Sequence, residues 1–94
     1  MSRPARMRAF WDRAARADAL LAVDDRGLRD EAFWAEGEAV VERFERDLGL
    51  TIAGERIVEI GCGVGRLTRV LAARAGEVVA IDVSPEMLTR ARTA

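Results

Sequence analysis

The segment from Arg56 to Arg66 constrains the fold of this 94-residue chain more than any other. It reads Arg-Ile-Val-Glu-Ile-Gly-Cys-Gly-Val-Gly-Arg, so a short apolar run leads directly into alternating glycines. Because glycine has no Cβ, such a loop can turn sharply off a strand and let a bound molecule approach the backbone closely. A helix starting at Arg66 would point its free amides at that molecule. We therefore predict a strand, a ligand-binding loop and a helix, in that order.

A second apolar run, Val78-Val79-Ala80-Ile81, is followed by Asp82, and Ser84 followed by Pro85 is typical of a helix start. We expect strands at 56–60 and 77–82, and helices over about 66–75 and 85–93. This is a βαβα unit. Continuous apolar strands of this kind are normally buried on both faces of a parallel sheet with right-handed crossovers. Two strands leave both sheet edges open, so we expect strands to be missing or supplied by a partner.

Within this unit, the helix over about 66–75 should end at Gly76. Its inward positions are Leu67, Val70 and Leu71, which follow three- and four-residue steps.

The first fifty residues predict two helices. The first runs from about Pro4 to Val23, and residues 24–27 should break it. The second runs from about Asp30, its expected N-cap, to Leu48, with Gly49 as the stop. The predicted apolar stripes are Phe10, Ala14, Ala17 and Leu21 on the first helix and Phe33, Gly37, Val40, Val41, Phe44 and Leu48 on the second.

Composition narrows the function classes. The 15 basic and 16 acidic residues give a net charge of −1, which does not favour nucleic acid or a membrane surface as a partner. The single cysteine, Cys62, cannot form an internal disulfide, and there is no histidine. Nothing resembles a secretory signal or a membrane span, so we expect a cytoplasmic protein. We expect no bound metal.

The glycine spacing differs from that of two well-known nucleotide-binding loops. A dinucleotide fingerprint requires glycine at position 66, which is Arg66 here. A phosphate loop requires a later glycine and a lysine, and the chain has neither at those positions. An NAD-dependent oxidoreductase is therefore disfavoured, and would require preferential binding of NAD.

The pattern Glu59-x-Gly61-x-Gly63-x-Gly65 resembles the first motif of class I S-adenosylmethionine-dependent methyltransferases, and Val79-Ala80-Ile81-Asp82 resembles their second. The resemblance covers residues 56–93. It implies an α/β, Rossmann-like methyltransferase fold that is incomplete, a βαβα unit preceded by a two-helix N-terminal extension. Residues 1–50 would form an N-terminal helical cap, and residues 51–94 the first half of a truncated cofactor-binding domain.

The resemblance also implies residue roles toward S-adenosyl-L-methionine. Gly61, Gly63 and Gly65 would pack against its methionine part and ribose. Asp82 would accept hydrogen bonds from both ribose hydroxyls, as a carboxylate can. Glu59 would help to fix the loop and the amino group of the cofactor. Cys62 belongs to the same loop, where we interpret it as a small packing residue because no histidine could activate it.

Structural alternatives remain for each residue. The glycines could form a tight turn without a ligand, and Glu59 could face solvent or pair with Arg56 or Arg66. Asp82 could cap the next helix together with Ser84. Trp11 and Trp34 favour packing over an aromatic cage for a sulfonium, although cation–π attraction would suit one. Met7 and Met87 are interpreted as filler.

We expect a methyltransferase with a small-molecule acceptor, acting by positioning and desolvation. No catalytic base is required and none can be named. The adenine-contacting and acceptor-binding segments of the family would follow residue 94, so the isolated chain should be inactive, as a fragment or a truncated product. The alternative is a noncatalytic binding module that needs self-association or a partner to complete its sheet.

Overall fold

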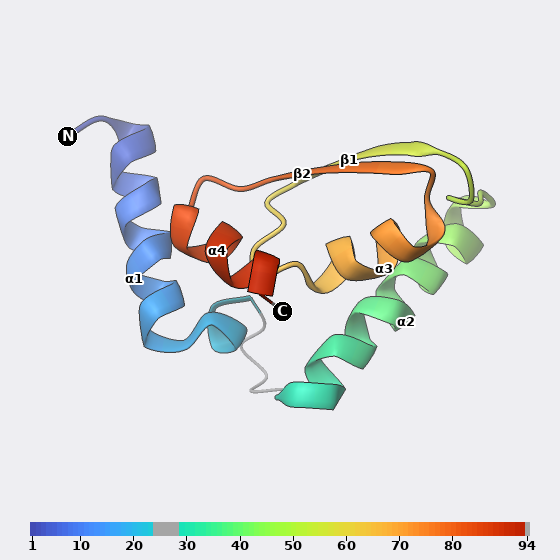
Figure 1. Ribbon diagram of the computed structural model, residues 1–94, viewed down its shortest axis with the longest axis horizontal. Coiled ribbons are helices and arrows are strands. Elements are labelled where there is room, and N and C mark those ends of the chain that lie inside the picture. Colours follow the sequence, from blue (N-terminus) through green and yellow to red (C-terminus); the bar gives the residue numbers. More distant parts are fainter. Residues whose placement is uncertain (24–28, 94) are drawn as a thin grey trace.

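The computed structural model describes residues 1–23 and 29–93 and contains two helices followed by a βαβα unit (Figure 1). The break expected at residues 24–27 lies outside the described residues. The elements are α1 (Arg3–Val23), α2 (Asp30–Leu48), β1 (Arg56–Ile60), α3 (Arg66–Arg74), β2 (Glu77–Ile81) and α4 (Pro85–Thr93). The prediction of an incomplete α/β fold with a two-helix N-terminal extension is confirmed.

The two strands form a parallel pair, with Arg56 opposite Glu77 and Ile60 opposite Ile81. Helix α3 connects them and packs through buried Val70 against Val41 of α2 and Ile52, with Leu67 and Leu71 partly buried beside it. The inward positions predicted for this helix are thus confirmed.

The end of α3 differs from the prediction. The helix ends at Arg74, and Ala75 follows in an extended conformation, so Gly76 is not its cap. Gly76 is instead pressed against the preceding loop, where a Cβ would lie 2.8 Å from the Gly54 carbonyl oxygen. The glycine therefore allows two backbone segments to approach each other.

Helix α1 is interrupted at Asp18, whose φ of −166° and ψ of 96° are extended. The Asp18 carboxylate accepts a hydrogen bond from the Leu21 amide at 3.1 Å, which is how an N-cap residue restarts a helix. The stripe predicted for this helix is wrong, since Phe10 and Leu21 are exposed. The buried contacts come from Ala15 and its neighbours because the break turns the chain between Ala17 and Ala19.

Helix α2 has the predicted range. Its N-cap is Arg29 rather than Asp30, which is the first helical residue, and its C-cap is Gly49 with a left-handed φ of 64°, as expected. The predicted stripe is correct at Phe33 and Val41, which are buried, and wrong at Phe44 and Leu48, which are exposed.

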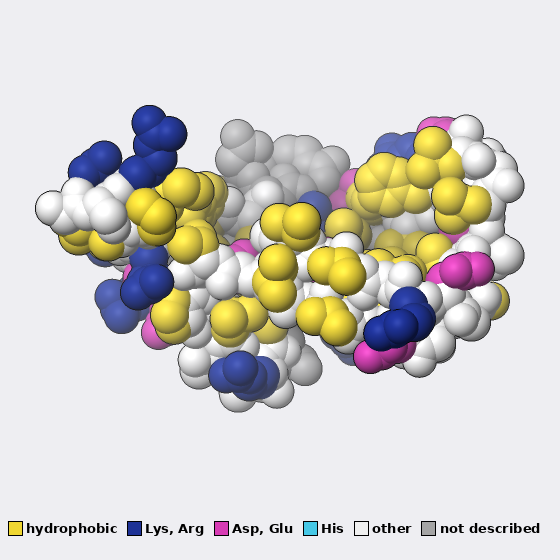
Figure 2. All heavy atoms as spheres, turned by 90° about the horizontal axis from the view of Figure 1, so that it is seen from above, with side chains coloured by type: hydrophobic (Ala, Val, Ile, Leu, Met, Phe, Trp, Pro, Cys, Tyr) yellow, Lys and Arg dark blue, Asp and Glu magenta, His cyan; other side chains and the backbone are white. Residues whose placement is uncertain are grey.

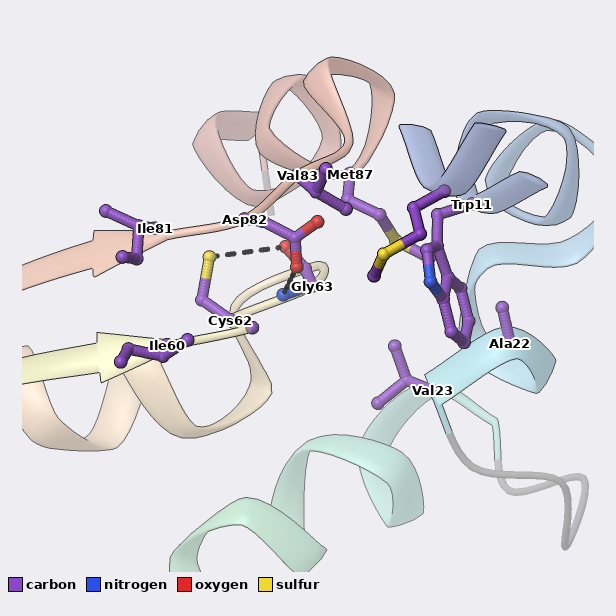
Figure 3. Close-up of a pocket in the computed structure, with 12 residues that line it drawn as sticks. Trp11, Ala22, Val23, Ile60, Cys62, Gly63, Ile81, Asp82, Val83 and Met87 are labelled. Atoms are coloured by element: carbon purple, nitrogen blue, oxygen red, sulfur yellow. Dashed lines mark hydrogen bonds between the residues drawn. The ribbon is translucent and has the colours of Figure 1, made fainter. Parts of the chain in front are cut away.

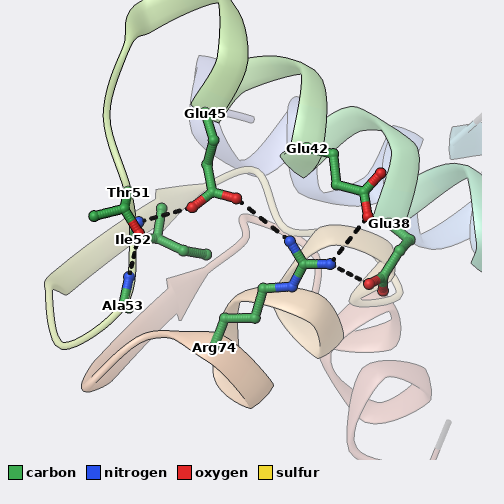
Figure 4. Close-up of polar contacts among 7 residues, drawn as sticks. All are labelled: Glu38, Glu42, Glu45, Thr51, Ile52, Ala53 and Arg74. Carbon is green, nitrogen blue, oxygen red and sulfur yellow. Dashed lines mark hydrogen bonds and ion pairs between the residues drawn. The ribbon is translucent and has the colours of Figure 1, made fainter.

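A charged cluster joins α2 to α3 (Figure 4). The Arg74 guanidinium contacts Glu38 and lies 3.4 Å from carboxylate oxygens of both Glu42 and Glu45. Glu45 also accepts a hydrogen bond from the Ile52 amide at 3.0 Å. The cluster therefore fixes α2, α3 and the loop before β1 relative to one another.

Within the described residues, one face of the sheet is covered and the other is exposed. Helices α2, α3 and α4 lie on one side of the strands in Figure 1, and α1 stands beyond the strand ends. Figure 2 looks down on the opposite side of the strands, where hydrophobic side chains gather. Val58, Ile60, Val79 and Ile81 are 66%, 81%, 49% and 46% exposed. The expectation that both faces are buried is therefore wrong for the residues described, because the described helices cover only the face that contains Ile57.

Candidate cofactor site

A cavity of about 630 Å³ lies between α1 and the carboxyl ends of the two strands (Figure 3). Its size falls in the range of small-molecule pockets, roughly 300 to 1,000 Å³. The lining is Met7, Trp11, Ala22, Val23, Ile60, Gly61, Cys62, Gly63, Ile81, Asp82, Val83 and Met87. It combines an apolar wall with one carboxylate and a stretch of glycine-rich backbone.

Backbone hydrogen bonds carry the strand pairing into the glycine loop. The Gly61 and Cys62 amides both donate to the Ile81 carbonyl, at 2.8 and 3.0 Å. Gly61, Gly63 and Gly65 have φ angles of 74°, 57° and 89°, which residues with a side chain rarely adopt. At Gly63 a Cβ would also lie 3.2 Å from Val23. The loop therefore needs glycine for its own path, whether or not a ligand is bound.

Asp82 closes the loop from the β2 side. One carboxylate oxygen accepts a hydrogen bond from the Gly63 amide at 2.8 Å, and the other accepts one from the Ser84 amide at 2.8 Å. The capping of α4 is done by Ser84, whose hydroxyl accepts a hydrogen bond from the Met87 amide at 3.1 Å. Each Asp82 oxygen has a second lone pair, so the carboxylate can still accept hydrogen bonds from a ligand's hydroxyls.

Four of the six residues predicted to contact a cofactor line the cavity: Gly61, Cys62, Gly63 and Asp82. Glu59 and Gly65 lie outside the lining. The Glu59 carboxylate accepts a hydrogen bond from the Thr68 hydroxyl, which links β1 to α3, and Gly65 is the N-cap of α3. Arg56, one of the alternative partners of Glu59, pairs with Glu77 at 2.7 Å.

The Cys62 side chain is buried. Burial raises the pKa of its thiol, and the negative charges of Glu59 and Asp82 raise it further. The thiol therefore stays protonated near neutral pH and is a poor nucleophile, since nucleophilic attack requires the thiolate. This agrees with its interpretation as a packing residue.

Helix α1 provides the wall opposite the strands. Met7, Trp11, Ala22 and Val23 face the cavity, with Trp11 placed across from Cys62 and Asp82 in Figure 3. The sequence favours packing for Trp11, with an aromatic cage for a sulfonium as the alternative, and Met7 and Met87 are interpreted as filler. The resemblance assigns residues 1–50 to a helical cap, but the sequence does not identify Met7, Ala22 and Val23 as its wall, because these residues come together only through the break at Asp18 and the packing of α1 on α4.

Two negative findings concern the described part of the chain. In residues 1–23 and 29–93 no helix combines the length and apolar character needed to cross a membrane. The same residues contain no group of three or more acidic or cysteine side chains arranged to hold a metal ion.

The strands and the glycine loop are similar in sequence to parts of known proteins. Residues 57–94 match a family model described as "Methyltransferase domain". The chain is 45% identical over 62 residues to the biotin biosynthesis bifunctional protein BioCD of Bordetella avium, covering 63% of this chain and 13% of that protein. It is 42% identical over 43 residues to a ubiquinone biosynthesis O-methyltransferase of Xanthomonas oryzae, covering 46% of this chain and 18% of the relative.

A demethylmenaquinone methyltransferase of Tropheryma whipplei is 47% identical over 45 residues, covering 48% of this chain and 18% of that protein. The fold also matches a solved structure, phosphoethanolamine N-methyltransferase 1 of Haemonchus contortus in complex with phosphoethanolamine and S-adenosylhomocysteine. That match has a TM-score of 0.64 and 25% identity, and it covers 99% of this chain and 20% of the other. The matched segments thus span less than a fifth of the length of these curated relatives.

Proposed function

We propose that this chain, which carries the first part of a class I S-adenosylmethionine-dependent methyltransferase domain, binds S-adenosyl-L-methionine in the cavity between α1 and the strand ends. The observation that carries the proposal is the lining of that cavity, where the glycine loop and Asp82 meet. In the Haemonchus contortus structure, S-adenosylhomocysteine accompanies a similar fold.

The residues present fit such a cofactor. Asp82 offers carboxylate oxygens with spare lone pairs for the ribose hydroxyls, while the loop from Gly61 to Gly63 has no side chain bulk except buried Cys62. Trp11 and Met87 supply part of an apolar wall, which would help to exclude water from a bound cofactor. When bound, S-adenosyl-L-methionine supplies an electrophilic methyl group on a positively charged sulfur.

For the whole protein we propose methyl transfer to a small-molecule acceptor. The support comes from the names of similar proteins. The relatives include a ubiquinone biosynthesis O-methyltransferase, a demethylmenaquinone methyltransferase and a biotin biosynthesis protein. The protein with a similar fold is a phosphoethanolamine N-methyltransferase. The chain's part is to hold the cofactor. We also propose that residues 1–50 act as a cap, because α1 forms one wall of the cavity.

A second candidate function is a noncatalytic module that needs a partner to complete its sheet. The exposed apolar face formed by Val58, Ile60, Val79 and Ile81 favours it. The candidates differ in their response to the cofactor, which only the first must bind.

The test is a calorimetric titration of the 94-residue chain with S-adenosylhomocysteine, with NAD as the control ligand. We expect saturable binding of S-adenosylhomocysteine alone. Asp82→Ala should weaken it about 10- to 100-fold, the range for losing hydrogen bonds to a charged group. Arg90→Ala should change it little, because Arg90 pairs with Glu86 and lies outside the cavity lining. Absence of binding, or equal losses in the two variants, would contradict the proposal.

A further inference from the structure

Asp12 of α1 makes polar contacts with residues far along the chain. Its carboxylate accepts a hydrogen bond from the Ser84 hydroxyl and another from the Glu86 amide at 3.2 Å. Ser84 is fully buried, with 0% exposure. The Asp12 carboxylate therefore serves as a second cap at the N-terminus of α4, supplied by a different helix.

The same serine also contacts the candidate cofactor site. Its amide donates to Asp82, and the other Asp82 oxygen accepts from the Gly63 amide, both at 2.8 Å. A continuous series of hydrogen bonds thus runs from α1 through Ser84 and Asp82 to the glycine loop. Both Asp82 and Gly63 line the cavity, and so does Trp11, the neighbour of Asp12 in the sequence.

We propose that Asp12 is a positioning residue that, through Ser84, couples the docking of α1 to the orientation of the Asp82 carboxylate. The inference rests on the proposed binding of S-adenosyl-L-methionine to this cavity. Binding of the cofactor and the docking of α1 are then energetically linked, because the same buried serine is bonded to both carboxylates.

The electrostatics favour a charged Asp12. The hydrogen bond from Ser84 holds the pKa of this carboxyl below its usual value, against a smaller opposing effect of desolvation. A charged carboxylate accepts stronger hydrogen bonds than a neutral group and also suits the positive end of α4.

Helix α1 is also held by apolar packing, so variants of Asp12 should still fold. Ala15 of α1 is buried in one cluster with Phe33, Val64 and Met87, so α1 has a second attachment that does not involve Asp12. Loss of the carboxylate should loosen the helix against the site while the core remains packed.

The experiment uses the 94-residue chain with Trp34→Phe, so that Trp11 is the sole tryptophan. S-adenosylhomocysteine is titrated while calorimetry measures affinity and Trp11 emission reports on α1. We expect Asp12→Ala to weaken binding about tenfold, or about 1.4 kcal/mol, and to abolish most of the ligand-induced change in emission. Asp12→Asn, which retains an oxygen acceptor at this position, should recover part of both. Asp47→Asn removes a charge at an exposed position on α2 and should match the parent.

A double variant tests whether Asp12 acts through Ser84. In a Ser84→Ala background, Asp12→Ala should cost clearly less affinity than in the parent, because the shared hydrogen bond is already gone. Circular dichroism verifies that each variant is folded, and Asp12→Asn carries the test if Asp12→Ala is not.

The outcomes distinguish failure of the proposed cofactor binding from failure of the positioning role of Asp12. A parent chain that does not bind S-adenosylhomocysteine overturns the proposed function and the inference with it. Normal binding by the parent, with unchanged affinity and emission response in Asp12→Ala, overturns only the positioning role. Full additivity in the double variant likewise contradicts action through Ser84.

Discussion

The two N-terminal helices are attached to the βαβα unit in different ways. Helix α1 packs on α4 beside the cavity, and its directed contacts are the hydrogen bonds of Asp12. Helix α2 packs on α3 through Val41 in the core and the glutamates around Arg74, and none of its residues lines the cavity. The sequence suggests one cap of two similar helices, whereas the structure distinguishes a helix at the site from a helix of the scaffold.

This difference has a physical consequence for what each helix can do. An element bonded to the site responds when a ligand changes that site, whereas an element bonded only to the core contributes to stability. We therefore expect substitutions on α2 to alter unfolding, and substitutions at the Asp12 contacts to alter ligand binding.

The largest expected effect on stability is at Phe33, where α2 meets the cluster containing Ala15 of α1. Phe33 is fully buried and the Arg66 guanidinium lies 5.2 Å from the centre of its ring. Phe33→Ala should lower the free energy of unfolding by about 3 to 5 kcal/mol, the usual cost of such a cavity. Phe44→Ala, on the same helix but 54% exposed, should cost under about 0.5 kcal/mol. Urea unfolding followed by circular dichroism measures both, and similar losses would contradict the assigned packing.

A smaller loss is expected at Arg74. Arg74→Met retains the apolar stem but leaves Glu38, Glu42 and Glu45 without their shared cation, so the urea midpoint should fall by less than in Phe33→Ala. High salt should reduce the difference from the wild type, because it screens the charges. Affinity for S-adenosylhomocysteine should not change. Arg46→Met, at a 72% exposed position, is the control, and a loss of affinity at Arg74 would show that α2 also acts on the site.

Sequence patterns could predict the fold where local chemistry decides. Both strands and α4 appear within one residue of their predicted ends, because apolar runs, glycines and a Ser-Pro start act over a few residues. The stripe on α1 could not be predicted in this way, since it assumes an unbroken helix and Asp18 interrupts it. Burial of the strands on both faces failed for another reason, namely that the apolar composition of Val58 and Val79 does not determine what covers them.

The candidate site was predictable residue by residue only on the strand side. The glycine loop and Asp82 are adjacent because parallel strands end at the same edge, which the sequence pattern implies. The predicted roles of these residues toward a cofactor stay predictions. The sequence assigned Trp11 and Asp12 to a cap, but their contacts with Met87, Ser84 and Glu86 could not be predicted, since these depend on how α1 packs against α4.

The smallest expected effect concerns acid and the break in α1. The contact with Arg29 and the hydrogen bond from the Leu21 amide lower the pKa of Asp18 from its ordinary 3.8 to about 2. A lowered pKa means that this carboxylate stabilises the folded chain above its ordinary value, and that the contribution is lost as the pH falls from about 4 to about 2. Asp18→Asn should therefore show a lower urea midpoint than the wild type at pH 6 and a smaller decrease between pH 4 and 2.

Because both Asp12 and Asp18 belong to α1, Trp11 emission in the Trp34→Phe chain should report loosening of this helix before the far-UV signal of the whole chain changes. Simultaneous loss of both signals in acid would mean that α1 and α2 unfold as one unit, and that the distinction between them does not extend to stability.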